Sequence, residues 1–348
     1  MTGPLDATQS LLASMVEALP EPVLLVSDSV RLLAANAPAK TLFPHLRIDA
    51  PLASSLRAVD LHDAIGRVRE TGVAENVSWL ARAPVERLFQ AHVGAFAAGG
   101  GRHVAVTLHD ATESRRLDQM RVDFVANASH ELRTPLASLL GFIETLQGPA
   151  RDDTSAREKF LGIMLQQARR MARLVDDLLS LSRIEQSLHV QPRASVDLAP
   201  VAQHVVDALS PLAQDNRVHL EVQAERTLVR GDRDELLRVA ENLIENAIKY
   251  GAPDAGEPDR KVWIKVGAAN GQGYLCVRDE GPGIDPANIP RLTERFYRVD
   301  VGQSRSKGGT GLGLALVKHI MARHRGRLGI QSEPGRGATF TAFAPLAD

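Results

Sequence analysis

Hydrophobic and polar residues follow a different spacing in each of three stretches of the chain. In the first stretch, short apolar runs are separated by turn residues such as the AAGGGR segment, which is typical of strands and hairpins. We therefore expect a small mixed domain from roughly Gln9 to Thr112. The runs predict a helix through Met15–Leu19, strands at Pro22–Val26 and Val30–Ala34, and a hairpin of Arg87–Phe96 and His103–His109.

The second stretch has the spacing of three and four residues that places apolar side chains on one face of a helix. One such run extends over 123–146, and the charged connector before it has a heptad-like spacing that predicts helix as well. Another begins at a capping box of Ser155 and Glu158 and ends near Arg183. These runs predict an α-hairpin, and its wide apolar face favours pairing with a second copy in a dimeric four-helix bundle.

The third stretch follows the linker SLHVQPRASVDL and alternates between helical and strand spacing. Alternating helices and antiparallel strands predict an α/β sandwich. We expect helices at Ala199–Leu209, Arg233–Tyr250 and Leu314–His324, and strands near His219–Gln223, Leu228–Arg230, Val262–Val266, Tyr274–Arg278, Arg327–Gln331 and Ala338–Phe343.

Composition and charge narrow the classes of function. A chain of 348 residues is longer than one ordinary core, and 24% charged with 44% hydrophobic residues is typical of a folded protein. The net charge of -1 gives no general attraction to nucleic acid or anionic membrane. The single cysteine, Cys276, excludes an internal disulfide, and no apolar run approaches the roughly 18 residues of a membrane span. We expect no nucleic-acid partner, no membrane span in this chain and a cytoplasmic location.

The helix predicted over 123–146 carries a candidate nucleophile. At about 100° per residue, His130 points about 165° away from the centre of the apolar stripe. Thr134 lies one turn further along, and Glu131 lies to the flank. A neutral imidazole is a nucleophile near neutral pH, and a neighbouring carboxylate can orient it and accept its proton. The alternative is that His130 is an ordinary surface histidine on the polar face of the helix, which is the simpler explanation for a histidine taken in isolation. Pro135 is expected to bend or loosen the helix here.

Two glycine-rich segments have the residue types of a nucleotide site. Asp279 ends a predicted strand, where its carboxylate can accept a hydrogen bond from the amine of adenine, although the Gly-Pro-Gly after it is also ordinary turn chemistry. The segment GGTGLGL runs into a helix and can present backbone N–H groups to phosphate. On the helix over 233–250, Asn242 and Asn246 can offer amide oxygens to Mg²⁺ or can simply face solvent.

Several segments together resemble the sensor histidine kinases of two-component signalling. SHELRTPL around His130 resembles the phosphoacceptor box of that family, and NLIENAIKYG resembles its N box. DEGPGI, ERFYRVD, GGTGLGL and GRGATF resemble the first glycine box, the F box, the second glycine box and the last glycine box. The resemblance covers about Leu117 to Phe343. It implies a homodimeric phosphotransfer domain at 115–190 and an ATP-binding domain at 195–348, of the GHKL type shared with gyrase, Hsp90 and MutL.

The resemblance also implies roles for individual residues. His130 would accept the γ-phosphoryl group of ATP, with Glu131 as its acid/base partner, and pass it to an aspartate of a response regulator. Asn246 would bind Mg²⁺ with support from Asn242, and Asp279 would recognise adenine. The other residues implied to lie at the nucleotide are Lys249, Tyr250, Gly281, Gly283, Arg298, Gly309, Thr310, Gly311, Leu312 and Gly313.

Further family features separate phosphoryl transfer from other reactions. ATPases of this type usually carry a water-activating glutamate where this chain has Asn242, and Glu241 and Glu245 are expected to face elsewhere, so rapid ATP hydrolysis is disfavoured. Thr134 matches the family position that orients water for removing phosphate from the regulator, which implies a bifunctional kinase and phosphatase. The segment 301–308 would be a mobile lid. The alternative is a signalling scaffold or a phosphatase-dominant pseudokinase.

Residues 1–114 are similar to a PAS sensor domain. The similarity lies in the predicted strand order, in the segment LLAANAPAKTLF and in the closing LHDATE. We interpret Asn36 in that segment as a residue that caps a loop. With RLDQMRVDFVANASHELRTPL, the chain is similar to the phosphate-regulon sensor group. The predicted fold class is multidomain α+β: a PAS-like domain, a helical hairpin that dimerises and an α/β sandwich that binds ATP.

Overall fold

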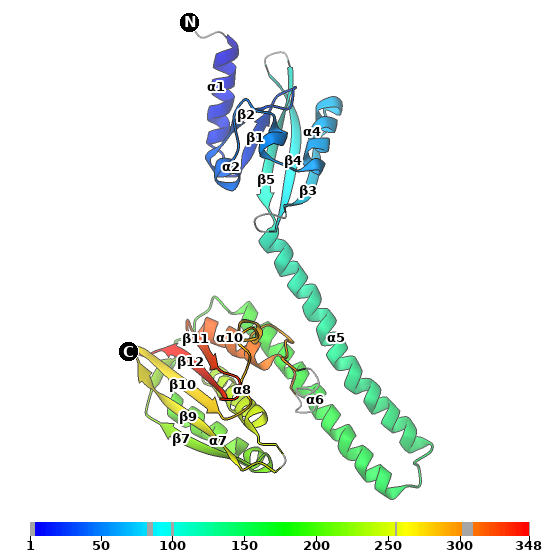
Figure 1. The fold of residues 1–348 in the computed structure, drawn as a ribbon, viewed down its shortest axis with the longest axis vertical. Coiled ribbons are helices and arrows are strands. Elements are labelled where there is room, and N and C mark those ends of the chain that lie inside the picture. Colours follow the sequence, from blue (N-terminus) through cyan, green and yellow to red (C-terminus); the bar gives the residue numbers. More distant parts are fainter. Residues whose placement is uncertain (1–3, 82–85, 99–100, 255, 301–308, 348) are drawn as a thin grey trace. The chain divides into compact units, whose positions relative to one another are not determined.

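The computed structural model describes residues 4–81, 86–98, 101–254, 256–300 and 309–347. It contains two compact units, Met1–Asp123 and Phe124–Asp348, and the boundary between them falls within the helix α5 (Figure 1). Each unit buries its own hydrophobic core. Among the described residues, every helix is too short or too polar to cross a membrane.

The first unit is built on an antiparallel sheet whose strand order is β2-β1-β5-β4-β3. Its strands are β1 (Val23–Val26), β2 (Leu32–Ala35), β3 (Glu75–Ala81), β4 (Arg87–Ala98) and β5 (Gly101–Asp110). Its helices are α1 (Pro4–Glu17), α2 (Ala37–Leu42), α3 (Leu52–Ser55) and α4 (Val59–Thr71). The apolar side of α4 packs into the main core of the unit, whereas Val16 of α1 joins a smaller cluster with Val23 and Leu25. The predicted hairpin is confirmed as β4 and β5.

Asn36 is fully buried and ties the start of α2 to the segment before β1. Its Oδ1 accepts hydrogen bonds from the N–H groups of Ala39, at 3.1 Å, and Val23, at 3.0 Å. Its Nδ2 donates to the carbonyl oxygens of Val16, Leu19 and Glu21. A buried amide with all of its hydrogen-bonding capacity used fixes the backbone around it. The interpretation of Asn36 as a capping residue is confirmed.

The second unit begins within the first of two long helices. They are α5 (Thr112–Gln147) and α6 (Thr154–Gln186), and their apolar faces meet near the connecting turn, where the rings of Phe142 and Phe160 lie 5.0 Å apart. This confirms the predicted α-hairpin. The helix α5 continues through Pro135, whose ring is buried.

The rest of the second unit is a sheet with helices on one face (Figure 1). The sheet has the order β11-β12-β10-β9-β7. Its strands are β7 (Val218–Ala224), β9 (Arg260–Ala269), β10 (Gln272–Asp279), β11 (Arg327–Ser332) and β12 (Ala338–Pro345). The covering helices are α7 (Leu198–Asp215), α8 (Arg233–Gly251) and α10 (Gly313–Arg323). A short pair, β6 (Ser195–Asp197) and β8 (Leu228–Arg230), and the 3₁₀ turn η1 (Ile289–Arg291) complete it.

Three sequence expectations about strand direction, helix capping and helix length were wrong in detail. Strands β7 and β9 run parallel, because the helix α8 lies between them in the chain and makes a crossover. The cap of α6 is Asp153, which accepts from the N–H of Ala156 at 2.9 Å, rather than Ser155. The first helix ends at Glu17, before Leu19, since the residue ahead of Pro20 is disfavoured in a helix.

The helix α7 does not stop at Leu209 as expected but continues through Pro211 to Asp215. Beyond Leu209, Leu212 and Ala213 pack into the core of the unit. Their burial stabilises the last turns of the helix despite the backbone hydrogen bond that the proline removes.

We expect Asn36→Ala to lower the free energy of unfolding of the first unit by about 2–4 kcal/mol, because the substitution leaves buried main-chain groups without partners. Asn76→Ala is the matched control, since Asn76 is exposed and its side chain bonds the His92 ring alone among the described residues; its effect should stay within about 0.5 kcal/mol. Urea unfolding followed by circular dichroism measures both. Equal effects of the two substitutions would contradict the role of Asn36.

Candidate active site

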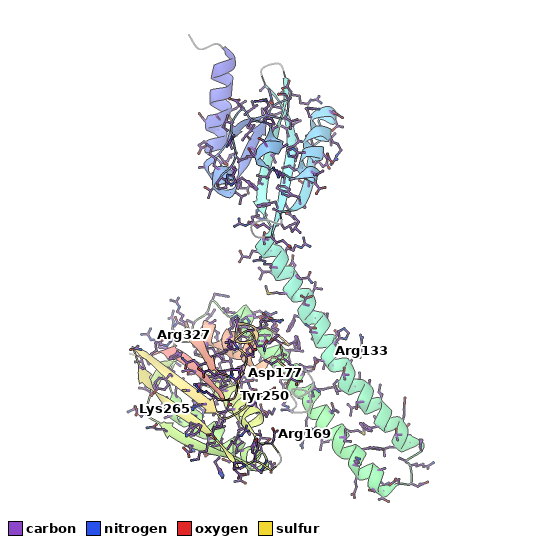
Figure 2. All side chains as sticks on the ribbon, in the orientation of Figure 1. Arg133, Arg169, Asp177, Tyr250, Lys265 and Arg327 are labelled. Carbon is purple, nitrogen blue, oxygen red and sulfur yellow. The ribbon has the colours of Figure 1, made fainter. Side chains whose placement is uncertain are left out.

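A cavity of about 380 Å³ lies among α8, the loop after β10 and the segment that leads into α10. Ligand cavities usually have volumes of about 300–1,000 Å³, so its size suits a small molecule. Figure 2 marks two of its lining residues, Asp177 on α6 and Tyr250 near the end of α8. The predicted nucleotide residues that line it are Asn242, Asn246, Lys249, Tyr250, Asp279, Gly283, Arg298, Gly309, Thr310, Gly311 and Gly313.

Two predicted nucleotide residues do not line the cavity. Gly281 is buried so closely against the carbonyl oxygen of Tyr250 that a Cβ would lie 2.6 Å from it. Leu312 is fully buried in the core of the unit.

Asp279 is the buried carboxylate of the cavity. Its Oδ1 accepts from the N–H of Gly281 at 2.8 Å and from the N–H of Ala338 at 3.2 Å. Burial raises the pKa of this carboxyl, and the two N–H donors oppose that shift. Among the described residues, Oδ2 accepts no hydrogen bond. One oxygen therefore holds the loop in place, while the other is available to a donor on a ligand.

The helix α8 brings polar side chains of several kinds to the cavity. Lys249 pairs with Glu245 at 2.6 Å, whereas the amide of Asn246 makes no hydrogen bond within the described residues. The expectation that Glu241 and Glu245 face elsewhere was wrong, because both line the cavity. Residues of α6 line the same cavity. The pKa of Glu241 is raised by burial, and Glu245 is held by two cations, Lys249 and Arg173.

Two glycines that line the cavity allow neighbouring groups to approach the backbone closely. A Cβ on Gly313, the first residue of α10, would lie 2.2 Å from Oδ1 of Asn242. The other side of the same amide donates from Nδ2 to the Arg238 carbonyl at 2.8 Å. Asn242 therefore packs between α8 and the start of α10. Gly283 has a φ of 73°, and a Cβ there would lie 2.0 Å from the Glu333 carbonyl oxygen.

Arg298 reaches from the F-box segment to the cavity wall. Its side chain is only 5% exposed, and its Nη2 donates to the Gly309 carbonyl and to Oε2 of Glu131, both at 2.9 Å. Within the described residues, the buried Nε has no partner. An arginine with an unsatisfied N–H beside a cavity suits an anionic ligand.

The two helical candidates, His130 and Thr134, are exposed, as predicted. The His130 imidazole makes no hydrogen bond within the described residues, and the Thr134 hydroxyl donates to the His130 carbonyl at 3.2 Å. In the part of the chain that the structure describes, the Glu131 carboxylate accepts from Arg170 and Arg298 and not from the His130 ring. The described structure thus gathers most of the nucleotide candidates into one cavity but leaves His130 outside its lining.

Three residues of α6 at the cavity or its edge were missed by the sequence analysis. Arg173 and Asp177 line the cavity, and Arg170 bonds Glu131 at 2.9 Å. They recur at spacings of three and four, which makes a polar stripe on a helix whose apolar stripe alone was considered. That spacing was the available signal. The predicted lid at 301–308 lies outside the described residues.

Comparison with known proteins identifies the family. Residues 120–187 match the His Kinase A (phospho-acceptor) domain, and residues 231–348 match the histidine kinase-, DNA gyrase B-, and HSP90-like ATPase. Together these ranges hold more than half of the 348 residues. The chain belongs to the sensor histidine kinases. This confirms the predicted family and the combination of a helical domain with a sheet-rich ATPase domain.

Individual relatives agree with this assignment. The chain is 43% identical over 250 residues to the phosphate regulon sensor protein PhoR of Pseudomonas aeruginosa, and the match covers 71% of this chain and 55% of PhoR. It is 35% identical over 243 residues to the sensor protein kinase WalK of Staphylococcus saprophyticus, covering 70% of this chain and 39% of WalK. The chain therefore spans about half of these relatives or less.

A solved structure shares the fold of this chain. It is the histidine kinase ThkA in complex with the response regulator protein TrrA, which superposes on 96% of this chain with a TM-score of 0.50 at 19% identity and covers 98% of that chain.

We expect Gly313→Ala to destabilise the second unit by about 1–3 kcal/mol, because the new methyl group would collide with the amide of Asn242 and force α10 to shift. Gly162→Ala in α6 is the matched control, since nothing lies within 4 Å of the added Cβ. Alanine is the better helix former there, so the control should be neutral or slightly stabilising. Urea unfolding of the full chain compares them; a Gly313→Ala protein as stable as the control would refute the close contact.

Proposed function

We propose that this chain binds ATP with Mg²⁺, phosphorylates itself on His130 and passes the phosphoryl group to an aspartate of a response regulator. The observation that carries the proposal is the single cavity lined by eleven of the predicted nucleotide residues, with Asp279 buried among them. That cavity and the exposed His130 belong to the same compact unit.

The cavity has suitable groups for each part of the nucleotide. The Oδ2 of Asp279 can accept a hydrogen bond from the amine of adenine, which guanine lacks at that position. Arg298 and Lys249 offer positive charge to the phosphates, and Thr310 and the glycines around it offer a hydroxyl and backbone N–H groups. The amide of Asn246, unbonded within the described residues, suits Mg²⁺, which takes few protein oxygens and would neutralise charge on the phosphates.

His130 supplies the nucleophile in this proposal. A neutral ring nitrogen attacks the γ-phosphorus, the bond to the β-phosphate oxygen breaks, and ADP leaves. The other change is the loss of the ring proton, which Glu131 would accept. Since Glu131 is held by Arg170 and Arg298 in this structure, it has to leave at least Arg298 to take that role.

The second step requires a partner protein. The histidine kinase ThkA was solved in complex with a response regulator protein, TrrA. We extend that kind of partner to this chain, with an aspartate of its receiver domain as the acceptor. The exposed Thr134 hydroxyl, beside His130, would orient the water that removes the phosphoryl group from the same aspartate. The kinase is therefore proposed to be a phosphatase as well.

A homodimer is the proposed assembly. Apolar side chains remain exposed along both long helices in the single chain: Leu136 is 50% and Leu140 52% exposed on α5, and Leu161 is 52% and Leu165 53% exposed on α6. Two copies of the hairpin can cover these residues in a four-helix bundle. For residues 1–114 we propose a PAS-like sensor, supported by the antiparallel five-stranded sheet and its helices.

The kinase proposal predicts that His130→Ala abolishes incorporation of label from γ-labelled ATP in the presence of Mg²⁺. The wild-type label should be acid-labile and alkali-stable, as expected for phosphohistidine. His189→Ala, at an exposed linker histidine, is the control and should retain the label. Label that persists in His130→Ala would refute the assigned acceptor, and a wild-type protein that is never labelled would favour the scaffold alternative.

The phosphatase proposal predicts that Thr134→Ala keeps autophosphorylation within about twofold of wild type but slows dephosphorylation of the regulator about tenfold or more, because a water-orienting hydroxyl is lost. Thr145→Ala is the matched control, since Thr145 lies on the same helix and likewise donates to the carbonyl four residues earlier. The measurement adds each variant to the isolated phosphorylated regulator and follows the release of phosphate. An unchanged rate in Thr134→Ala would refute this role.

A further inference from the structure

Carboxylates from the phosphotransfer helices bind two of the groups that the proposed ATP site would use for phosphate. Asp177 of α6 accepts from the Thr310 hydroxyl at 2.9 Å, and Glu131 of α5 accepts from Arg298 at 2.9 Å. Thr310 and Arg298 both line the nucleotide cavity. A carboxylate and a phosphate accept hydrogen bonds from the same kinds of donor.

The first contact places a negative charge inside the cavity. Asp177 is largely buried, and burial raises the pKa of its carboxyl, while the Thr310 hydrogen bond opposes that shift. Thr310 belongs to the glycine-rich segment before α10, and Gly309 and Gly311 on either side of it also line the cavity. In this arrangement the Asp177 carboxylate accepts the hydrogen bond that the Thr310 hydroxyl could otherwise donate to a phosphate.

The second contact is an ion pair, whereas the first joins a carboxylate to a neutral hydroxyl. Glu131, whose side chain is 15% exposed, accepts from both Arg298 and Arg170, each at 2.9 Å. Breaking an enclosed ion pair leaves an unpaired charge, which then favours a new counter-ion. An Arg298 released from Glu131 would remain at the cavity wall, where the phosphates of a nucleotide can replace the carboxylate.

The same face of α6 also makes apolar contact with the ATP-binding domain. Leu174, Leu181 and Ile184 are buried in one cluster with side chains of that domain, including Leu316 and Ile320 of α10. Phe124 of α5 packs against Phe296 with ring centroids 5.9 Å apart. The two carboxylate contacts therefore lie at the cavity end of a docked interface within the second unit.

We propose that Asp177 and Glu131 act as internal substitutes for phosphate, which hold the ATP-binding domain on the phosphotransfer helices until the phosphates of ATP displace them. This proposal rests on the proposed function, since it needs a nucleotide in the cavity. Displacement frees Glu131 to serve His130 and frees the domain to carry ATP to the imidazole. Because the two events are thermodynamically linked, a change that strengthens docking weakens nucleotide binding. Likewise, nucleotide binding weakens docking.

We call the two contacts, Asp177 with Thr310 and Glu131 with Arg298, the latch. Asp177→Ala tests the latch separately from phosphoryl transfer, because Asp177 is not assigned to the reaction. Removing the competing carboxylate should lower the dissociation constant of Mg-AMP-PNP about three- to tenfold in the full chain, measured by calorimetry. Asp177→Asn keeps an acceptor without the charge and should fall between Asp177→Ala and wild type. The control is Asp176→Ala, at the exposed neighbouring carboxylate, which should bind as wild type does.

Hydrogen exchange distinguishes release of the docked domain from a simple change of local charge. Mg-AMP-PNP should raise amide exchange in residues 170–185 of the wild-type protein, and it should raise it less in Asp177→Ala, where docking is already weaker. Affinities of Asp177→Ala and Asp176→Ala that are equal to wild type, or no change in exchange on binding, would overturn the latch alone. A folded wild-type protein that binds no Mg-AMP-PNP would overturn the proposed function and the latch together.

Discussion

The buried carboxylate of Asp279 is the constraint around which the ATP-binding domain is arranged. Its Oδ1 joins the loop after β10 to β12 through two backbone N–H groups, and its burial requires close approach by the surrounding chain. A Cβ on Gly337 would lie 2.0 Å from the Asp279 carbonyl oxygen, and a Cβ on Gly251 would lie 3.0 Å from its Cβ. Glycines of two of the family boxes thus let the chain pack closely around Asp279.

The second level of organisation is the contact between that domain and the phosphotransfer helices. Arg298, on the ATP-binding side, and Glu131, next to His130, form an enclosed ion pair, so the group proposed to bind phosphate and the group proposed to accept a proton are engaged with one another. In this arrangement His130 is exposed and lies outside the cavity lining, whereas most of the predicted nucleotide residues line the cavity.

Much of this structure could be predicted from local patterns. The hairpin β4–β5 followed from alternation and glycine, the long helices α5 and α6 from their apolar stripes, and Asp279 from its place at the end of a strand. What could not be predicted depends on contacts distant in sequence. The burial of Leu212 and Ala213 carried α7 through Pro211. The polar stripe of α6 could be seen in the sequence, but only the docking of that helix brought Arg173 and Asp177 to the cavity. The pairing of Glu131 with Arg298 joins residues 167 positions apart, which no local period reports.

The central claim is that the cavity binds adenine through Oδ2 of Asp279, and nucleotide selectivity tests this claim most directly. Calorimetry of the full chain should show Mg-AMP-PNP binding about 100-fold or more tightly than Mg-GMP-PNP, because guanine presents an acceptor where adenine presents a donor. Asp279→Asn should lose most of that preference while circular dichroism shows a folded protein. Equal affinity of the wild-type protein for the two nucleotides, or an Asp279→Asn protein that keeps the full preference for adenine, would contradict the account.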